Sequence, residues 1–65
     1  MMKWWNIAKE FGVTNVEPDP DTRGGFVGVV DCSLAPDACK ALQQAGYYTS
    51  TSRDEGVTYI WWHKS

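Results

Sequence analysis

Apolar residues near the start of the chain recur with the spacing of an amphipathic helix. Four of them would fall on one helical face: Trp4, Ile7, Ala8 and Phe11. Gly12 follows at the position of a C-terminal cap. The pattern therefore predicts a short helix over residues 2–11.

A second stripe of apolar residues indicates another helix further along the chain. Its members follow one another at i, i+4, i+7, i+8 and i+11: Leu34, Ala38, Ala41, Leu42 and Ala45. Ser33 precedes the stripe and can cap the N-terminus of the helix. Pro36 falls in the first turn, where its missing N–H is harmless, and Asp37 lies near the positive end of the helix. We expect Gly46 to end it.

The remaining segments are rich in β-prone residues and are separated by turn residues. VTNVE (13–17) and the valine-rich GFVGVVDC (25–32) flank DPDTRGG, which predicts a hairpin with a long tip. A second hairpin is predicted within YYTSTSRDEGVTYIWWHK, around the turn sequence Asp54-Glu55-Gly56.

The last of these strands carries large apolar side chains on both of its faces, because side chains alternate along a strand. One face would hold three alternate residues: Val57, Tyr59 and Trp61. The other face would hold the residues between and after them: Thr58, Ile60 and Trp62. Each face thus has a tryptophan, and the sequence leaves open which face packs on the helices.

The predicted order of elements is α-β-β-α-β-β, which indicates the α+β class. We expect a single small domain over residues 1–65, in which an antiparallel sheet of about four strands carries two helices on one face. A chain of this length buries only about 60% of its surface on folding, so large side chains must fill the core. The tryptophan pairs Trp4-Trp5 and Trp61-Trp62 lie near opposite ends of the chain. This predicts that the two ends meet in one core.

Charge and composition restrict the classes of function. The formal net charge is −2 and the six Lys and Arg residues are scattered, so we do not expect direct binding to nucleic acid. No apolar run approaches the roughly 20 residues of a membrane span, and MMKWWNIAKEF lacks the hydrophobic stretch of a signal peptide. We therefore expect a protein of the bacterial cytoplasm without membrane association. Cys32 and Cys39 would lie about 10 Å apart along a helix, too far for a disulfide, so free thiols are expected.

Neither a metal site nor a catalytic site is predicted. A calcium loop starting at Glu17 would need glycine at its sixth position and glutamate at its twelfth, but Thr22 and Gly28 stand there. The potential zinc ligands are one too few and lack zinc-site spacing: Cys32, Cys39 and His63. No phosphate-binding glycine loop precedes a helix, and the cysteines have no obvious base. We therefore expect no enzymatic activity and no cofactor.

The segment VEPDPDTRGG places three carboxylates at alternate positions around two prolines. In an extended chain Glu17, Asp19 and Asp21 would project to one side about 6.6 Å apart, whereas in polyproline geometry they would fan out. The second hairpin tip adds Asp54 and Glu55, so five of the eight carboxylates lie at hairpin tips. Asp, Pro and Gly are also ordinary turn residues, and a solvated turn is the alternative interpretation.

Taken as a whole, the chain resembles the small acidic anti-CRISPR proteins of phages and mobile elements. The resemblance lies in a stand-alone domain of 65 residues with negative net charge, four tryptophans and no catalytic motif. It covers the general character of the whole chain and involves no shared motif. It implies inhibition without catalysis, by occupation of the DNA-binding or PAM-reading surface of a CRISPR effector, in some members as a DNA mimic.

The leading hypothesis is a non-enzymatic inhibitor that binds a larger nucleic-acid-handling protein complex, with a CRISPR effector as candidate partner. A line of carboxylates can replace a nucleic-acid backbone, which carries one charge per about 3.4 Å of each strand. The candidate partner-binding residues are the five tip carboxylates and one aromatic anchor: Glu17, Asp19, Asp21, Asp54, Glu55 and Trp62.

Two other hypotheses stay open. In the first, the protein is a small single-stranded nucleic-acid-binding module, in which Tyr48, Tyr59 or Trp62 stacks on bases. In the second, an exposed tryptophan face makes the protein a weak homodimer rather than a monomer. Titration with oligonucleotides tests the first, and light scattering tests the second.

Overall fold

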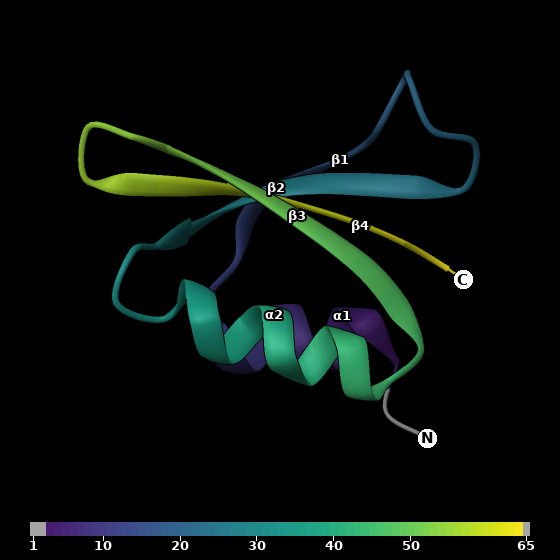
Figure 1. Ribbon diagram of the computed structural model, residues 1–65, viewed down its shortest axis with the longest axis horizontal. Helices are drawn as coiled ribbons and strands as arrows, with labels where there is room; N and C mark the ends of the chain where they lie inside the picture. Colours follow the sequence, from purple (N-terminus) through teal and green to yellow (C-terminus); the bar gives the residue numbers. More distant parts are fainter. Residues whose placement is uncertain (1–2, 65) are drawn as a thin grey trace.

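The computed structural model describes residues 3–64 and has the predicted order of two helices and four strands (Figure 1). The elements, in chain order, are α1 (Trp4–Phe11), β1 (Thr14–Pro18), β2 (Gly25–Asp31), α2 (Ala35–Gln44), β3 (Tyr47–Asp54) and β4 (Val57–Lys64). The strands form one sheet in the order β1-β2-β4-β3, and each neighbouring pair is antiparallel. The α+β class and the α-β-β-α-β-β order predicted from the sequence are confirmed.

Both helices lie on the same face of the sheet, as predicted, and no element within residues 3–64 covers the opposite face (Figure 1). We call this second face the open face. In β4, Thr58, Ile60 and Trp62 are buried under the helices. The alternate residues Tyr59 and Trp61 consequently project from the open face.

α1 agrees with its prediction at the C-terminal end. It ends at Phe11, and Gly12 caps it in the left-handed conformation with φ of 72°. At the other end the helix begins at Trp4, because Lys3 has extended backbone angles. Residue 2, where the predicted helix started, lies outside the described residues.

The start of α2 corrects one prediction. Ser33 does not cap the helix: its hydroxyl donates a hydrogen bond to Asp31 Oδ2 (2.9 Å), and the N-cap residue is Leu34, without a side-chain cap. Leu34 is 39% exposed and therefore stands outside the predicted apolar stripe. The backbone N–H of Leu34 donates a hydrogen bond to Asp31 O (2.9 Å). Leu34 therefore belongs to the turn that leads from β2 into the helix and not to the buried face of the helix. Pro36 and Asp37 occupy the first turn, as predicted.

The core lies between the sheet and the helices and joins the two ends of the chain, as predicted. Trp4 of α1 lies 5.5 Å from Trp62 of β4 between ring centroids, and 4.5 Å from Phe26 of β2. The largest fully buried side chains are Trp62, Ile7, Leu42, Ile60 and Val30. Only one tryptophan of the first pair takes part, because Trp5 is 53% exposed.

β1 is an edge strand of the sheet, and it contains a β-bulge and lies close to Gly28 of β2. The register of β1 shifts between Thr14 and Glu17, and Asn15 adopts a positive φ of 53°. A Cβ atom on Gly28 would lie 2.6 Å from Val13 Cγ1, so this close approach requires glycine. Neither helix within residues 3–64 is long and apolar enough to span a membrane.

Candidate functional site

The strand register aligns side chains from all four strands in rows across the open face. In the first row, Asp19 donates its N–H to Gly25 O (2.9 Å), Gly25 lies opposite His63, and His63 lies opposite Tyr48. The neighbouring row on the same face has four members: Glu17, Val27, Trp61 and Ser50. Residues distant in sequence are thereby brought together at one end of the sheet.

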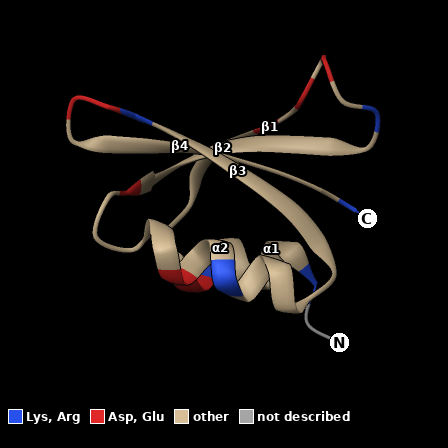
Figure 2. Cartoon of the chain, viewed as in Figure 1, with Lys and Arg blue, Asp and Glu red and all other residues tan. Residues whose placement is uncertain are grey.

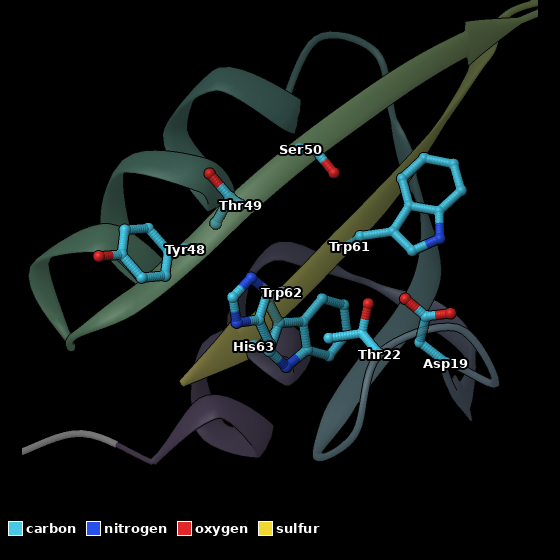
Figure 3. A pocket seen from close by; sticks show the side chains of 8 residues that line it. All are labelled: Asp19, Thr22, Tyr48, Thr49, Ser50, Trp61, Trp62 and His63. Carbon is cyan, nitrogen blue, oxygen red and sulfur yellow. The ribbon is translucent and has the colours of Figure 1, made fainter. Parts of the chain in front are cut away.

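A hollow of about 400 Å³ lies where these two rows meet (Figure 3). Its lining is Asp19, Thr22, Tyr48, Thr49, Ser50, Trp61, Trp62 and His63. Gly25, in the middle of the first row, is covered by Thr22: a Cβ atom on Gly25 would lie 3.1 Å from Thr22 Cβ. Thr22 in turn lines the hollow. The Tyr48 and His63 rings, which also line it, contact each other, with centroids 5.3 Å apart at an interplanar angle of 41°.

The tip between β1 and β2 is held by its own hydrogen bonds. Asp19 Oδ1 accepts the N–H of Asp21 (3.0 Å), and Asp19 O accepts the N–H of Thr22 (3.3 Å). Gly25 then donates its N–H to Thr22 O (3.0 Å) and closes the turn. The Asp19 side chain is half-buried beside the hollow, whereas Glu17 and Asp21 are exposed.

The five predicted carboxylates lie in two separate groups at opposite ends of the sheet (Figure 2). The start of β2 pairs with the end of β4, as Gly25 does with His63, and the end of β2 pairs with the start of β4. The β1–β2 tip and the β3–β4 tip must therefore point in opposite directions. Glu17, Asp19 and Asp21 belong to the first tip, and the second tip contains the other two: Asp54 and Glu55.

Trp62, which was named as a partner-binding residue, belongs to the core and presents almost no exposed surface. Trp62 is 1% exposed and packs against Trp4 and Phe26. Its neighbour Trp61 is only half-buried and lines the hollow from the open face. Because a strand alternates its side chains, a shift of one residue exchanges the core side for the open side.

Sequence reasoning missed Trp61 and His63 as candidate contact residues. The alternation along β4 did place Trp61 on a face of its own with Tyr59, and their rings lie 6.2 Å apart between centroids. What the sequence lacked was a signal for the open face, since each face carries a tryptophan. Tyr48, which was named for the nucleic-acid-binding hypothesis, is 60% exposed beside His63.

Charge is distributed unequally between the two layers of the molecule (Figure 2). The helices and the residue before α1 carry three cations and two carboxylates: Lys3, Lys9, Lys40, Glu10 and Asp37. The sheet and its hairpin tips carry three cations and six carboxylates: Arg23, Arg53, Lys64, Glu17, Asp19, Asp21, Asp31, Asp54 and Glu55.

The open face itself is free of cations within residues 3–64. Arg53 and Lys64 alternate with Asp54 and His63 along their strands and so project to the helix side. Arg23 belongs to the β1–β2 tip. Over the part of the chain that is described, no salt bridge joins a Lys or Arg to any of the tip carboxylates. Within residues 3–64, the negative charge of the two tips is therefore not compensated by an ion pair.

The two cysteines lie beside a second hollow, of about 250 Å³, on the helix side of the sheet. Both have free thiols, and Thr58 donates its hydroxyl hydrogen to Cys32 Sγ (3.2 Å). Burial raises the pKa of the Cys39 thiol above its ordinary value, and a hydrogen bond with Thr49 opposes this in part. A raised pKa keeps the thiol protonated and therefore a poor nucleophile.

Comparisons with known proteins leave the site to be interpreted from its own chemistry. No protein-family model matches the chain, and neither a curated protein nor a solved structure matches it. Among residues 3–64, no group of three or more His, Cys, Asp or Glu side chains is placed to hold a metal ion. The open face, its hollow and the two acidic tips are the features that a function must explain.

Proposed function

We propose that this chain is a non-enzymatic, anti-CRISPR-like inhibitor that occupies a basic nucleic-acid-binding surface of a larger effector complex. The observation that supports the proposal is the charge distribution. Six of the eight carboxylates belong to the sheet and its tips. No strand between residues 3 and 64 adds a Lys or Arg side chain to the open face.

The dimensions of the molecule suit a groove that binds a short stretch of nucleic acid. The longest axis measures 29 Å, and the two acidic tips lie toward its opposite ends (Figure 1). A nucleic-acid strand carries one phosphate per about 3.4 Å, so this length corresponds to roughly eight phosphates. A partner groove lined with Lys and Arg over that length would meet carboxylates at both ends of this protein.

Aromatic side chains between the two tips supply the apolar part of the interface. Electrostatic complementarity mainly speeds encounter and selects the partner, whereas desolvated aromatic anchors contribute most of the affinity. Tyr48, Tyr59 and Trp61 all project from the open face. In this proposal the tips orient the protein in the basic groove and the rings contact the partner surface.

A charge-reversal pair tests this proposal directly. The test variant is Glu17→Lys/Asp21→Lys on the β1–β2 tip, and the matched control is Glu10→Lys/Asp37→Lys on the helices. All four residues are exposed, and both variants change the net charge equally. Effector complexes that a tagged chain captures from a bacterial lysate are purified, and their binding to labelled target DNA is measured by fluorescence anisotropy.

We expect the wild-type chain and the helix control to displace the DNA, with an affinity that falls as salt is added. The tip variant should lose this inhibition while it retains its circular-dichroism spectrum. Unchanged inhibition by the tip variant contradicts the proposal. So does a captured complex that still binds DNA normally with the chain attached.

The exposed rings of the open face favour a second candidate function, a single-stranded nucleic-acid-binding module. Tyr48 and Tyr59 are 60% and 37% exposed, and stacking on such rings tolerates any base. Binders of this kind combine the rings with a positively charged groove, which the open face lacks. Quenching of tryptophan fluorescence by a single-stranded oligonucleotide at low salt would favour this second function over the first.

A further inference from the structure

We propose that the hollow between the first two rows of the open face is a receptor for a single arginine side chain of the partner. This inference rests on the proposed function for the origin of the arginine. The receptor itself is argued from its lining, which includes one carboxylate (Asp19), two rings on the open face (Tyr48 and Trp61) and the imidazole of His63.

The carboxylate of the receptor is Asp19, which the tip holds in a fixed position. Its Oδ1 accepts the N–H of Asp21 (3.0 Å). Within residues 3–64, Oδ2 of the same carboxylate accepts no hydrogen bond and can receive a guanidinium N–H. The hydrogen bond to Oδ1 fixes the carboxylate before a ligand arrives, which lowers the entropic cost of binding.

The aromatic walls of the receptor suit a flat cation. In the view of Figure 3, Trp61 and Asp19 lie on one side of the hollow, and Tyr48 and His63 lie on the other. A cation is attracted to the face of a tryptophan or tyrosine ring. Among residues 3–64, no Lys or Arg lines the hollow, so no permanently charged cation on its walls repels a guanidinium.

Arginine fits this lining better than lysine does. The guanidinium is planar, stacks on aromatic faces and presents a fork of N–H donors to a carboxylate. The guanidinium is also more weakly hydrated than an ammonium group, so the free-energy cost of removing its water on entering a half-enclosed space is smaller. We therefore expect the hollow to discriminate between two peptides that carry the same charge.

The probe is a fluorescein-labelled peptide with Arg at every third position in a Gly-Ser background, compared with its Lys counterpart of equal length and charge. The test variant is Asp19→Asn, since the asparagine Oδ1 can still accept the N–H of Asp21 and preserve the turn. The matched control is Asp21→Asn, which removes the same charge from the same tip but lies outside the lining of the hollow.

For the wild-type chain we expect the Arg peptide to bind about five-fold more tightly than the Lys peptide. Asp19→Asn should weaken Arg-peptide binding about ten-fold, which corresponds to the loss of one charged hydrogen bond, and should abolish the preference for Arg. Asp21→Asn should weaken both peptides slightly and equally. Equal binding of the two peptides by the wild-type chain overturns the receptor, and so do equal effects of the two substitutions.

The peptide assay and the DNA-displacement assay can fail separately. If the chain prefers the Arg peptide but displaces no DNA from the complexes it captures, the receptor stands and the proposed function is rejected. If DNA is displaced but the peptides bind equally, docking uses the tips without an arginine receptor. The two ideas are therefore tested independently.

Discussion

The two faces of the sheet are built from the same kinds of residue and differ in what covers them. On β4, Trp62 and Trp61 are adjacent in sequence, yet Trp62 is fully buried under the helices while Trp61 borders a hollow on the open face. On the helix side, aromatic rings from both ends of the chain, Trp4 and Trp62, pack against each other in the core. The open side combines exposed rings with carboxylates. The comparison indicates that the helix side determines stability and that the open side is available for binding.

The largest effect that separates the two faces is expected for the adjacent tryptophans. Trp62→Ala should lower the free energy of unfolding by about 3–5 kcal/mol, because it leaves a large cavity in the core. The total free energy of unfolding of a domain of this size is roughly 3–10 kcal/mol, so the Trp62→Ala variant should be largely unfolded. Trp61→Ala should cost less than about 1.5 kcal/mol. Urea unfolding followed by circular dichroism measures both, and similar losses would remove the distinction between the faces.

A second contrast uses the two glycines of β2 that face opposite sides. Gly28→Ala places a Cβ 2.6 Å from Val13 Cγ1 on the helix side and should destabilise the protein by about 1–3 kcal/mol through overpacking. Gly25→Ala meets Thr22 at 3.1 Å and should cost about 1 kcal/mol or less, because a small shift relieves the contact. Its main effect should be on the hollow, because the displaced Thr22 lines it.

Thermal unfolding and Arg-peptide binding are both measured for Gly25→Ala and for Gly28→Ala. Thermal unfolding should rank Gly28→Ala as the less stable of the two. Arg-peptide binding should be weaker for Gly25→Ala than for Gly28→Ala at a temperature where both are folded. The reverse order in either measurement would show that stability and binding are not divided between the faces in this way.

Within residues 3–64, the helix side also contains a thiol, Cys39, whose burial is expected to link stability to pH. The pKa of the Cys39 thiol is raised in the folded protein, so the folded state holds this proton more tightly than the unfolded state does. The contribution is therefore present below the pKa of the unfolded thiol and is lost as the pH rises through the folded pKa. The free energy of unfolding should decline slightly less with alkaline pH in Cys39→Ala than in the wild type. A steeper decline in the variant would contradict the burial of this thiol.

The elements of the fold were predictable because their signals are local. Helical spacing marked α1 and α2, and turn residues marked both hairpins. Ser33 was assigned wrongly because the helix begins one residue later, with Leu34 as its N-cap, while the Ser33 hydroxyl donates to Asp31. The exact start of the helix depends on the turn after β2, which a propensity argument does not describe.

The arrangement of the candidate site depended on strand pairing, which the sequence did not specify. The pairing of β2 with β4 sends the two acidic tips to opposite ends and brings Gly25 opposite His63. The same pairing decides which tryptophan of β4 is buried, and the sequence had left this open. The carboxylates of the tips were found from sequence because charged turn residues stay exposed in almost any arrangement.

The most direct test of the open face as a binding surface follows the indole N–H signals of the four tryptophans by NMR. Each signal is assigned with a Trp→Phe variant, and the Arg-rich peptide is then added to saturation. We expect a large shift for Trp61 and small ones for Trp4, Trp5 and Trp62. Shifts confined to Trp5, which lies on α1, would place binding on the helix side and exclude the open face as the binding surface.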